Sequence, residues 1–484
     1  MSEEADNNKV LKSWIGGKSV AVEGADNAQL VSPWDGSNVF QVQCGGEDIV
    51  SQAVDSAYET YVANRKATSL QRKEWLLAAA DEVAKSVEEI AQSSVRAIGK
   101  PIRAARFEIN RTVAFMRACA EEIGHVTGEV LPVDIAKTGA GRTGSTRRVP
   151  YGVIGAITPF NAPANLLIQK VAPAIAVGNA IVVKPSFEGA EVALLIAQCF
   201  TRAGVPDGLF NVAIGRREEA QALARHPKVP VLTLTGGNGA ANALGAVAAA
   251  KPLFSELGGN SANIVLADAD IADSAKRIAA SAFEASGQQC ISAQRIIVEA
   301  PIFEEFSKLF IAATEAMKVG NPNEPDTDLG PMINVEAAKR VESMIEDAVS
   351  TGATLACGGN RDGAVINPTI LVNPAREAQV IRQEIFGPAA VLIEVVDVDE
   401  AIEVANDSDF GLQAACFTNN LTNTMRVSDE IQAGSIWIND ASRFRLDIYP
   451  FGGMGLSGFG REGVKYAMEE FSQWKFTGIR IPGN

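Results

Sequence analysis

Short apolar runs alternate with longer amphipathic segments along most of the chain. Two of the apolar runs are VIGAITP at 153–159 and AIVVKPS at 180–186, and both end in proline or polar residues, as buried parallel strands do. The segment between them, NLLIQKVAPAIAVG at 165–178, has apolar residues at helical spacing and ends in glycine, which is a common helix stop. This alternation predicts an α/β fold in which helices cover both faces of a parallel sheet.

The alternation continues to residue 440 and divides the chain into two lobes. With 484 residues, the chain exceeds the roughly 250–300 residues at which a single core stops growing. We place the boundary between the lobes at 256/257. The polar stretch at 126–148 interrupts the pattern and predicts a hairpin that projects from the body. Helices are expected over 50–92, 102–123, 271–286 and 303–317.

The composition argues against several classes of protein. A net charge of −15 and a pI of about 4.9 disfavour a nucleic-acid-binding surface, which needs clustered basic residues. No apolar run reaches the roughly 20 residues of a membrane span, and the acidic start MSEEADNNKV lacks the features of a secretory signal. The six cysteines are scattered and only two histidines are present. We therefore expect no metal site, free thiols and a reducing, cytoplasmic location.

One cysteine has surroundings that differ from those of a packing residue. Cys290 lies in SGQQCISAQR, where Gln288, Gln289 and Ser292 are polar neighbours and Gly287 permits a close turn. A free cysteine is usually a small buried hydrophobic residue. The polar context instead favours a nucleophile, whose reactive form is the thiolate.

Two further polar residues follow predicted strands. Glu256, in FSELGGN, is either a strand-end residue in solvent or a general base whose pKa is raised by burial. Asn161, in ITPFNAPAN, is either a turn asparagine or an amide N–H donor to a developing oxyanion. Because histidines are so few, a carboxylate is the favoured base.

Two other strand ends favour a phosphate-containing ligand. Lys184, in VVKPS, ends a predicted parallel strand, where open α/β sheets bind ligands. The segment LTLTGGNGA at 232–240 runs from a strand into a glycine turn and then a helix. The N-terminus of such a helix offers backbone N–H groups to a phosphate.

These pieces, in this order, resemble the aldehyde dehydrogenase superfamily over residues 12–480. Glu256 of ELGG and Cys290 of GQQC are 34 residues apart, as in that family. The segment IRQEIFGP at 381–388 resembles the E-x-F-G-P element of the family, and PFGGMGLSGFGREG at 450–463 resembles its C-terminal signature. The joint arrangement is specific, whereas each motif alone is not.

The resemblance implies a fold of three parts and an oligomeric state. The parts are a Rossmann-type cofactor domain at 1–125 and 149–256, a second α/β catalytic domain at 257–450, and a small β oligomerisation arm at 126–148 and 471–484. The stretch FSQWKFTGIRIP at 471–482 reads as an edge strand, which is an aggregation hazard unless it is covered. We therefore expect a homodimer or homotetramer.

The resemblance also implies a reaction. Cys290 would attack an aldehyde carbonyl to form a thiohemiacetal, whose oxyanion the Asn161 side chain and the Cys290 backbone N–H would hold. Hydride transfer would leave a thioester, and Glu256 would activate the water that releases a carboxylic acid. The cofactor, NAD or NADP, would be bound by Thr158, Phe160, Lys184, Ser186, Gly236, Gly237, Glu384 and Phe386.

Two departures from the family pattern bear on the cofactor. The second glycine of the phosphate turn is replaced by Ala241, and the acid that takes the ribose hydroxyls in many NAD-preferring members is replaced by Phe187. Without that acid a 2′-phosphate is not repelled, and Arg216 and Arg217 follow one strand later. The preference between NAD and NADP therefore stays open.

Arginines before the C-terminal signature indicate the kind of substrate. Arg443 and Arg445 would point the same way if their segment were extended, and Arg111 matches a helix position that binds the anionic end of the substrate in some relatives. With Gln289, these arginines are expected to bind a short aldehyde carrying phosphonate, sulfonate, phosphate or carboxylate, through charge-assisted contacts. Ordinary salt bridging is the competing interpretation. Both regions resemble the branch of lactaldehyde, phosphonoacetaldehyde and non-phosphorylating glyceraldehyde-3-phosphate dehydrogenases.

Three alternatives to this function are compatible with the fold. The nearest are a succinate-semialdehyde-type enzyme and a CoA-acylating semialdehyde dehydrogenase. The presence of Glu256 argues against the CoA-acylating type, whose members generally lack a base there. A non-catalytic structural protein of the same fold is a third alternative. The presence of Cys290, Glu256 and Asn161 argues against it.

Overall fold

The first lobe is built on an eight-stranded sheet in the order β24-β12-β11-β8-β9-β10-β2-β3. The computed structural model describes residues 9–481, so residues 1–8 of the expected first domain and 482–484 of the expected arm lie outside the described residues. The five central strands run parallel. They are β8 (Val153–Ile157), β9 (Ala180–Lys184), β10 (Phe210–Val212), β11 (Val231–Thr235) and β12 (Leu253–Glu256).

The strand order reverses between β8 and β11, which is the switch point where such sheets bind ligands. The strands β8, β9 and β11 are buried at every position. Both faces of the sheet are therefore covered, which explains why these strands are continuous apolar runs rather than alternating ones. Three short antiparallel strands complete the sheet, namely β2 (Ser13–Ile15), β3 (Lys18–Val20) and β24 (Gly458–Phe459).

Helices of the first lobe come from three parts of the chain. Four follow the central strands: α5 (Asn165–Ala176), α6 (Ala190–Arg202), α7 (Arg217–Arg225) and α8 (Asn238–Ala248). Four precede them: α1 (Gly46–Asn64), α2 (Ser69–Lys85), α3 (Val87–Ile98) and α4 (Ile102–Glu122). The last, α15 (Val464–Glu470), packs on α5. A separate small sheet holds β1 (Val10–Leu11), β5 (Asn38–Cys44) and β4 (Asp26–Val31).

The second lobe has a seven-stranded sheet in the order β15-β18-β19-β14-β13-β21-β22. All its strands are parallel except β15. They are β13 (Ala262–Val265), β14 (Arg295–Glu299), β15 (Thr354–Cys357), β18 (Thr369–Val372), β19 (Ala389–Val395), β21 (Gln413–Phe417) and β22 (Ser435–Ile438). The helices are α9 (Ile271–Phe283), α10 (Ala300–Glu315), α11 (Val335–Ser350), α12 (Gln379–Arg382), α13 (Val398–Asn406) and α14 (Leu421–Glu430). Short pairs are β16 (Arg361–Asp362) with β17 (Val365–Ile366) and β20 (Phe410–Gly411) with β23 (Met454–Gly455).

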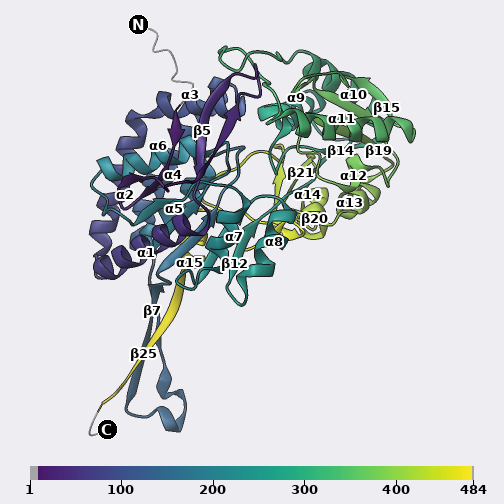
Figure 1. Cartoon of the computed structure of the whole chain (residues 1–484). Coiled ribbons are helices and arrows are strands. Elements are labelled where there is room, and N and C mark those ends of the chain that lie inside the picture. Colours follow the sequence, from purple (N-terminus) through teal and green to yellow (C-terminus); the bar gives the residue numbers. More distant parts are fainter. Residues whose placement is uncertain (1–8, 482–484) are drawn as a thin grey trace.

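A three-stranded arm projects from the first lobe (Figure 1). In it, β25 (Ser472–Arg480) pairs antiparallel with β7 (Arg142–Pro150) along its whole length, and β7 pairs with β6 (Val130–Leu131). The strand β25 lies at the edge of this sheet, as its sequence indicates. Trp474, Phe476 and Ile479 on β25 are exposed.

Two expected helices differ from the structure. The stretch 50–92 forms three helices rather than one, because Thr68 caps the start of α2 with a capping box and Ser86 separates α2 from α3. The expected helix 271–286 ends at Phe283, because Ala285 and Ser286 adopt left-handed backbone angles that a helix does not accommodate. This early turn lies close to Cys290 and shapes the site described below.

Residues 9–481 contain neither a candidate membrane span nor a candidate metal-binding cluster. No helix there has both the length and the apolar character needed to cross a membrane. Within the same residues, no group of three or more His, Cys, Asp or Glu side chains is arranged to hold a metal ion.

Candidate active site

The candidate residues gather at the carboxyl ends of the central strands of the first lobe. Asn161 follows β8, Lys184 ends β9, Gly236 follows β11 and Glu256 ends β12. Because these strands are parallel, their carboxyl ends meet at one edge of the sheet. Cys290 comes from the second lobe, on the loop between α9 and β14.

Glycines let the three sequence motifs pack directly on one another. A Cβ atom on Gly258 would lie 2.4 Å from a carboxylate oxygen of Glu384, and one on Gly259 would lie 2.5 Å from the Cys290 carbonyl oxygen. A Cβ atom on Gly287, whose φ is +65°, would lie 2.1 Å from the Gly387 carbonyl oxygen. Any side chain at these positions would collide with backbone or with Glu384. The ELGG, GQQC and EIFGP segments are therefore one packed unit around the cysteine.

Asn161 is held beside the cysteine loop. Its Nδ2 atom donates to the Gln288 carbonyl oxygen at 2.9 Å, and its Oδ1 atom accepts from the Ala162 N–H. An amide NH₂ group carries two hydrogens, so one hydrogen is left to point at a ligand. Asn161 and Cys290 line the same cavity.

A buried ion pair that the sequence did not reveal supports the Asn161 loop. Glu108 of α4 accepts hydrogen bonds from the backbone N–H groups of Ala164 and Asn165, and its other oxygen pairs with Lys100. Lys100 in turn donates to the Asn161 carbonyl oxygen at 2.9 Å. Both charged side chains are buried. The only signal for this pair in the sequence is that Glu108 occupies a helical position that the apolar pattern assigns to the core.

Glu256 is buried at the end of β12, and neither of its carboxylate oxygens has a hydrogen-bond partner of normal geometry among the described residues. Burial, together with the negative charge of Glu462, raises its pKa to about 8. The Cys290 thiol is near enough to oppose this shift in part. The solvent-exposed interpretation of Glu256 is therefore wrong.

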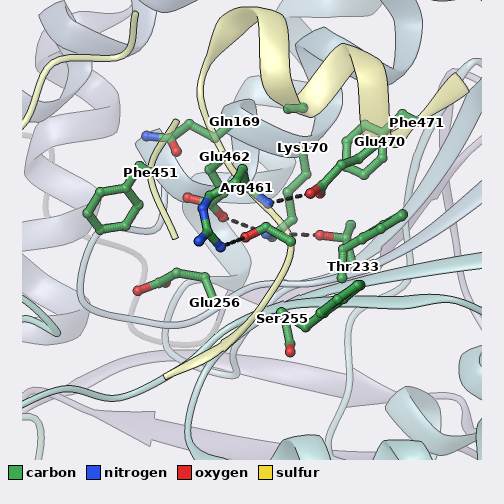
Figure 2. Close-up of a pocket in the computed structure, with 14 residues that line it drawn as sticks. Gln169, Lys170, Thr233, Ser255, Glu256, Phe451, Arg461, Glu462, Glu470 and Phe471 are labelled. Atoms are coloured by element: carbon green, nitrogen blue, oxygen red, sulfur yellow. Dashed lines mark hydrogen bonds and ion pairs between the residues drawn. The ribbon is translucent and has the colours of Figure 1, made fainter. Parts of the chain in front are cut away.

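Behind Glu256 lies a second group of buried charges (Figure 2). Lys170 of α5 donates to Glu462 at 3.0 Å and to the Thr233 hydroxyl at 3.2 Å. Burial would raise the pKa of Glu462, but Lys170 and Arg445 outweigh it and hold that pKa at about 2. Lys170 and Glu462 are not among the site residues expected from the sequence. A lysine within the apolar helix NLLIQKVAP was the available signal, since a buried lysine requires a partner.

The Cys290 thiol lines an inner cavity of about 90 Å³. Burial and the neighbouring Glu256 carboxylate raise the pKa of this thiol. The sulfur is therefore protonated in the ligand-free protein and has to lose a proton before it reacts as a nucleophile.

All the expected substrate-binding residues line this inner cavity, namely Arg111, Gln289, Arg443 and Arg445. Each arginine is paired with an acid: Arg111 with Asp447, Arg443 with Glu284 and Arg445 with Glu462. The segment that carries Arg443 and Arg445 is not extended, because Ser442 and Arg443 form a turn. The side chains of Arg443 and Arg445 make different contacts beside the cavity. Arg445 packs over the Phe451 ring, whereas Arg443 donates to Gln289.

Most of the expected cofactor residues lie at or just after the carboxyl ends of β8, β9 and β11. Gly236 and Gly237 precede α8, and added Cβ atoms there would meet only Leu234 or nothing, so the turn is open to a bound group. The Lys184 ammonium has no hydrogen bond or ion pair to any described residue, and the buried Thr158 hydroxyl has no partner among them. The Ser186 hydroxyl accepts from the Gly189 N–H and closes the turn before α6. Unpaired polar atoms beside an open glycine turn fit a phosphate-containing cofactor.

The two lobes meet at the remaining expected cofactor residues. Glu384 accepts from the Gly259 N–H at 3.0 Å, and burial raises its pKa to about 7. Phe386, with a φ of +45°, contacts Phe160 edge to face at 6.0 Å between ring centres. At the outer end, the Arg216 guanidinium lies 5.5 Å from the centre of the Phe187 ring.

Comparisons with known proteins give the same assignment as the motifs. Residues 20–477 match the aldehyde dehydrogenase family. The chain is 38% identical over 458 residues to 3-sulfolactaldehyde dehydrogenase from Priestia aryabhattai, covering 94% of this chain and 96% of that protein.

Two solved structures show the same fold along nearly the whole chain. Aldehyde dehydrogenase 21 from Physcomitrella patens, in complex with the reaction product succinate, superposes with a TM-score of 0.94 at 33% identity and covers 99% of both chains. NADP-dependent glyceraldehyde-3-phosphate dehydrogenase from Bacillus halodurans, complexed with NADP, superposes with a TM-score of 0.94 at 30% identity, covering 97% of this chain and 99% of that one. The expected α/β fold class is confirmed, and the chain belongs to the aldehyde dehydrogenase family.

Proposed function

We propose that this aldehyde dehydrogenase oxidises a short aldehyde carrying an anionic group to the corresponding carboxylic acid, through a thioester on Cys290. The observation that carries the proposal is the inner cavity, where Cys290 and Asn161 lie with three arginines. A volume of about 90 Å³ is smaller than the roughly 150 Å³ that admits benzene. Such a cavity suits an aldehyde of few heavy atoms.

In the first half of the reaction, the Cys290 sulfur bonds to the carbonyl carbon. Its proton leaves as the bond forms, and the adjacent Glu256 is a suitable acceptor because its pKa is about 8. The free Nδ2 hydrogen of Asn161 and the Cys290 backbone N–H donate to the oxyanion that results. When bound, NAD or NADP supplies the hydride acceptor that converts this thiohemiacetal into a thioester.

In the second half, water attacks the thioester carbon. Glu256, after releasing the proton of Cys290 to solvent, takes a proton from this water. The carbon–sulfur bond then breaks, the acid leaves, and the departing thiolate takes that proton back from Glu256. Splitting one oxidation into two steps of lower barrier is the advantage of a covalent intermediate. Because Glu256 provides a base that can activate water, hydrolysis of the thioester is favoured over transfer of the acyl group to CoA.

The cofactor would be held by residues that need no rearrangement of the backbone. The open Gly236–Gly237 turn would receive the pyrophosphate, Lys184 the adenosine ribose and Glu384 the nicotinamide ribose. With Phe187 in place of an acid, Arg216 gives a 2′-phosphate a positive partner. This arrangement is compatible with NADP as well as NAD.

The anionic class of substrate is supported by the arginines and by one relative. Arg443 and Arg111 line the cavity and keep N–H groups that have no partner among the described residues. Arginine is suited to sulfonate, phosphate or carboxylate because its donors form a planar fork. The similar Priestia aryabhattai protein is a 3-sulfolactaldehyde dehydrogenase.

We also propose a homo-oligomer that forms through the arm, in the cytoplasm. Exposed apolar side chains on the edge strand β25 support the assembly. All six cysteines are free thiols, which supports a reducing compartment.

The substrate class is tested with a pair of aldehydes that differ only in a sulfonate. 3-Sulfolactaldehyde and lactaldehyde would be compared in the wild type and in Arg443→Ala, with NAD and with NADP. We expect the wild type to prefer sulfolactaldehyde in kcat/KM, and Arg443→Ala to raise the KM for sulfolactaldehyde by about 10- to 100-fold, the loss of a charge-assisted hydrogen-bond pair. Equal kcat/KM for the two aldehydes in the wild type would reject the anionic class.

A further inference from the structure

Two cavities meet at a single ion pair. The inner cavity of about 90 Å³ holds Cys290, and a more open outer cleft of about 480 Å³ lies between α4 and the α9–α10 region. Ala104, Phe107, Glu284 and Arg443 line both of them. A ligand that enters the inner cavity from this cleft therefore passes beside the Glu284–Arg443 pair.

The Glu284–Arg443 contact is weaker than the neighbouring pair of the same kind. Asp447 accepts two hydrogen bonds from Arg111, at 2.6 and 3.1 Å, and a third at 3.4 Å from Gln169. Glu284 accepts one, from Arg443 Nη2, and its side chain is 35% exposed against 15% for Asp447. Glu284 is therefore the acid that a ligand can replace at smaller cost, because it keeps access to water.

The backbone fixes where Glu284 stands relative to the cysteine. The three residues that follow it, Ala285, Ser286 and Gly287, all have left-handed φ values of 53°, 57° and 65°. The Ser286 hydroxyl donates to the Gly330 carbonyl oxygen at 2.8 Å. Non-glycine residues adopt such angles at a cost of about 1–3 kcal/mol each, which the surroundings have to offset. The turn sets Glu284 against Arg443 and leads directly into the Cys290 loop.

Arg443 keeps unused hydrogen-bond donors while it is paired with Glu284. Its Nε atom donates to Gln289 at 2.9 Å and its Nη2 atom contacts Glu284, whereas Nη1 has no partner among the described residues. A sulfonate or carboxylate that approached Nη1 and Nη2 together would share the Nη2 atom with the Glu284 carboxylate. Two anions at one guanidinium nitrogen repel each other.

We propose that Glu284 is a specificity-determining residue that occupies Arg443 in the free enzyme and is displaced into the outer cleft by the anionic end of the substrate. The inference rests on the proposed function, because it assigns Arg443 to that anionic end. Glu284 thereby raises the KM for anionic aldehydes, and it leaves neutral aldehydes, which do not compete for Arg443, less affected.

The test is Glu284→Gln, which keeps the shape of the side chain and removes its charge. The ratio of KM for 3-sulfolactaldehyde to KM for lactaldehyde is expected to fall about fivefold relative to the wild type, the upper end of the range for a partly exposed ion pair. The control is Glu305→Gln, because Glu305 is an exposed residue of α10 that itself lines neither cavity. It should leave the ratio within twofold.

A second measurement keeps the inference testable if turnover of either aldehyde is slow. Inorganic sulfate would be assayed as a competitive inhibitor against lactaldehyde, and its inhibition constant should fall about fivefold in Glu284→Gln. A rise or no change in both quantities, with Arg443→Ala still raising the KM for sulfolactaldehyde, would overturn the role of Glu284 and leave the proposed function intact. If the wild type does not prefer the sulfonated aldehyde, the proposed function itself fails.

Discussion

Glu256 is a buried carboxylate whose pKa is raised to about 8. Part of the shift, however, comes from Glu462, which is itself kept ionised by Lys170 and Arg445. These partners come from distant parts of the chain, with Lys170 and Glu462 292 residues apart. No local pattern indicates that they meet.

The raised pKa of Glu256 predicts the direction of the pH dependence. Below pH 8 the carboxylate is protonated and cannot accept a proton from water, so kcat should rise with pH and level off above an apparent pKa of about 8. In Glu256→Gln this rising limb should vanish and kcat should fall about 100- to 10,000-fold, the usual contribution of a general base. The measurement is kcat from pH 6 to pH 10 for both proteins. A wild-type profile that is flat over this range, or that falls, would contradict the assignment.

At the scale of elements, the helix expected over 271–286 is shorter in the structure, because a turn leads from it into the Cys290 loop. The apolar periodicity of 271–286 continues past Phe283, so the sequence predicts a longer helix. Tertiary contacts decide otherwise, because Gly287 has to approach the Gly387 carbonyl closely. The loop after β8 is a second case, since its support by Glu108 and Lys100 comes from the preceding helical region. The strands were predictable from apolar runs, whereas these loop contacts were not.

The support of the Asn161 loop predicts that Glu108 is a positioning residue. Glu108→Gln should lower kcat at least about tenfold, because the two N–H groups it holds precede α5 and a shift of the loop misaligns the oxyanion donor. The change also leaves Lys100 buried without its partner, which costs about 3–5 kcal/mol of stability. The double variant Lys100→Met with Glu108→Gln should regain thermal stability while kcat stays low. Recovery of kcat together with Tm would mean that Glu108 acts on stability alone.

At the scale of the whole molecule, the division at 256/257 coincides with the change of sheet from β12 to β13. The sequence did not indicate that the chain returns to the first sheet after it leaves the second. After the second lobe, β24 pairs with β12 at Glu256 itself, and α15 packs on α5. This return brings Glu462 behind the base. Non-local pairings of this kind depend on the packed fold rather than on any periodicity.

The exposed edge of the arm predicts how copies of the protein associate. Trp474 and Phe476 lie two positions apart on β25 and are both about half exposed, so they share one face of the strand. We expect a dimer or tetramer in solution, and the double variant Trp474→Glu with Phe476→Glu should dissociate it. Mass measurement in solution checks both proteins. A wild type that has only the 51.0 kDa mass of one chain would refute the assembly.

The central claim is that a thioester forms on Cys290 and that Glu256 is needed to hydrolyse it. The most direct measurement is the intact mass of Glu256→Gln after mixing with aldehyde and cofactor, followed by mapping of the modified residue. We predict a stable acyl adduct on Cys290, with one equivalent of reduced cofactor formed per active site and no adduct on Cys290→Ser. Steady turnover by Glu256→Gln without an adduct, or an adduct on another cysteine, would contradict this account.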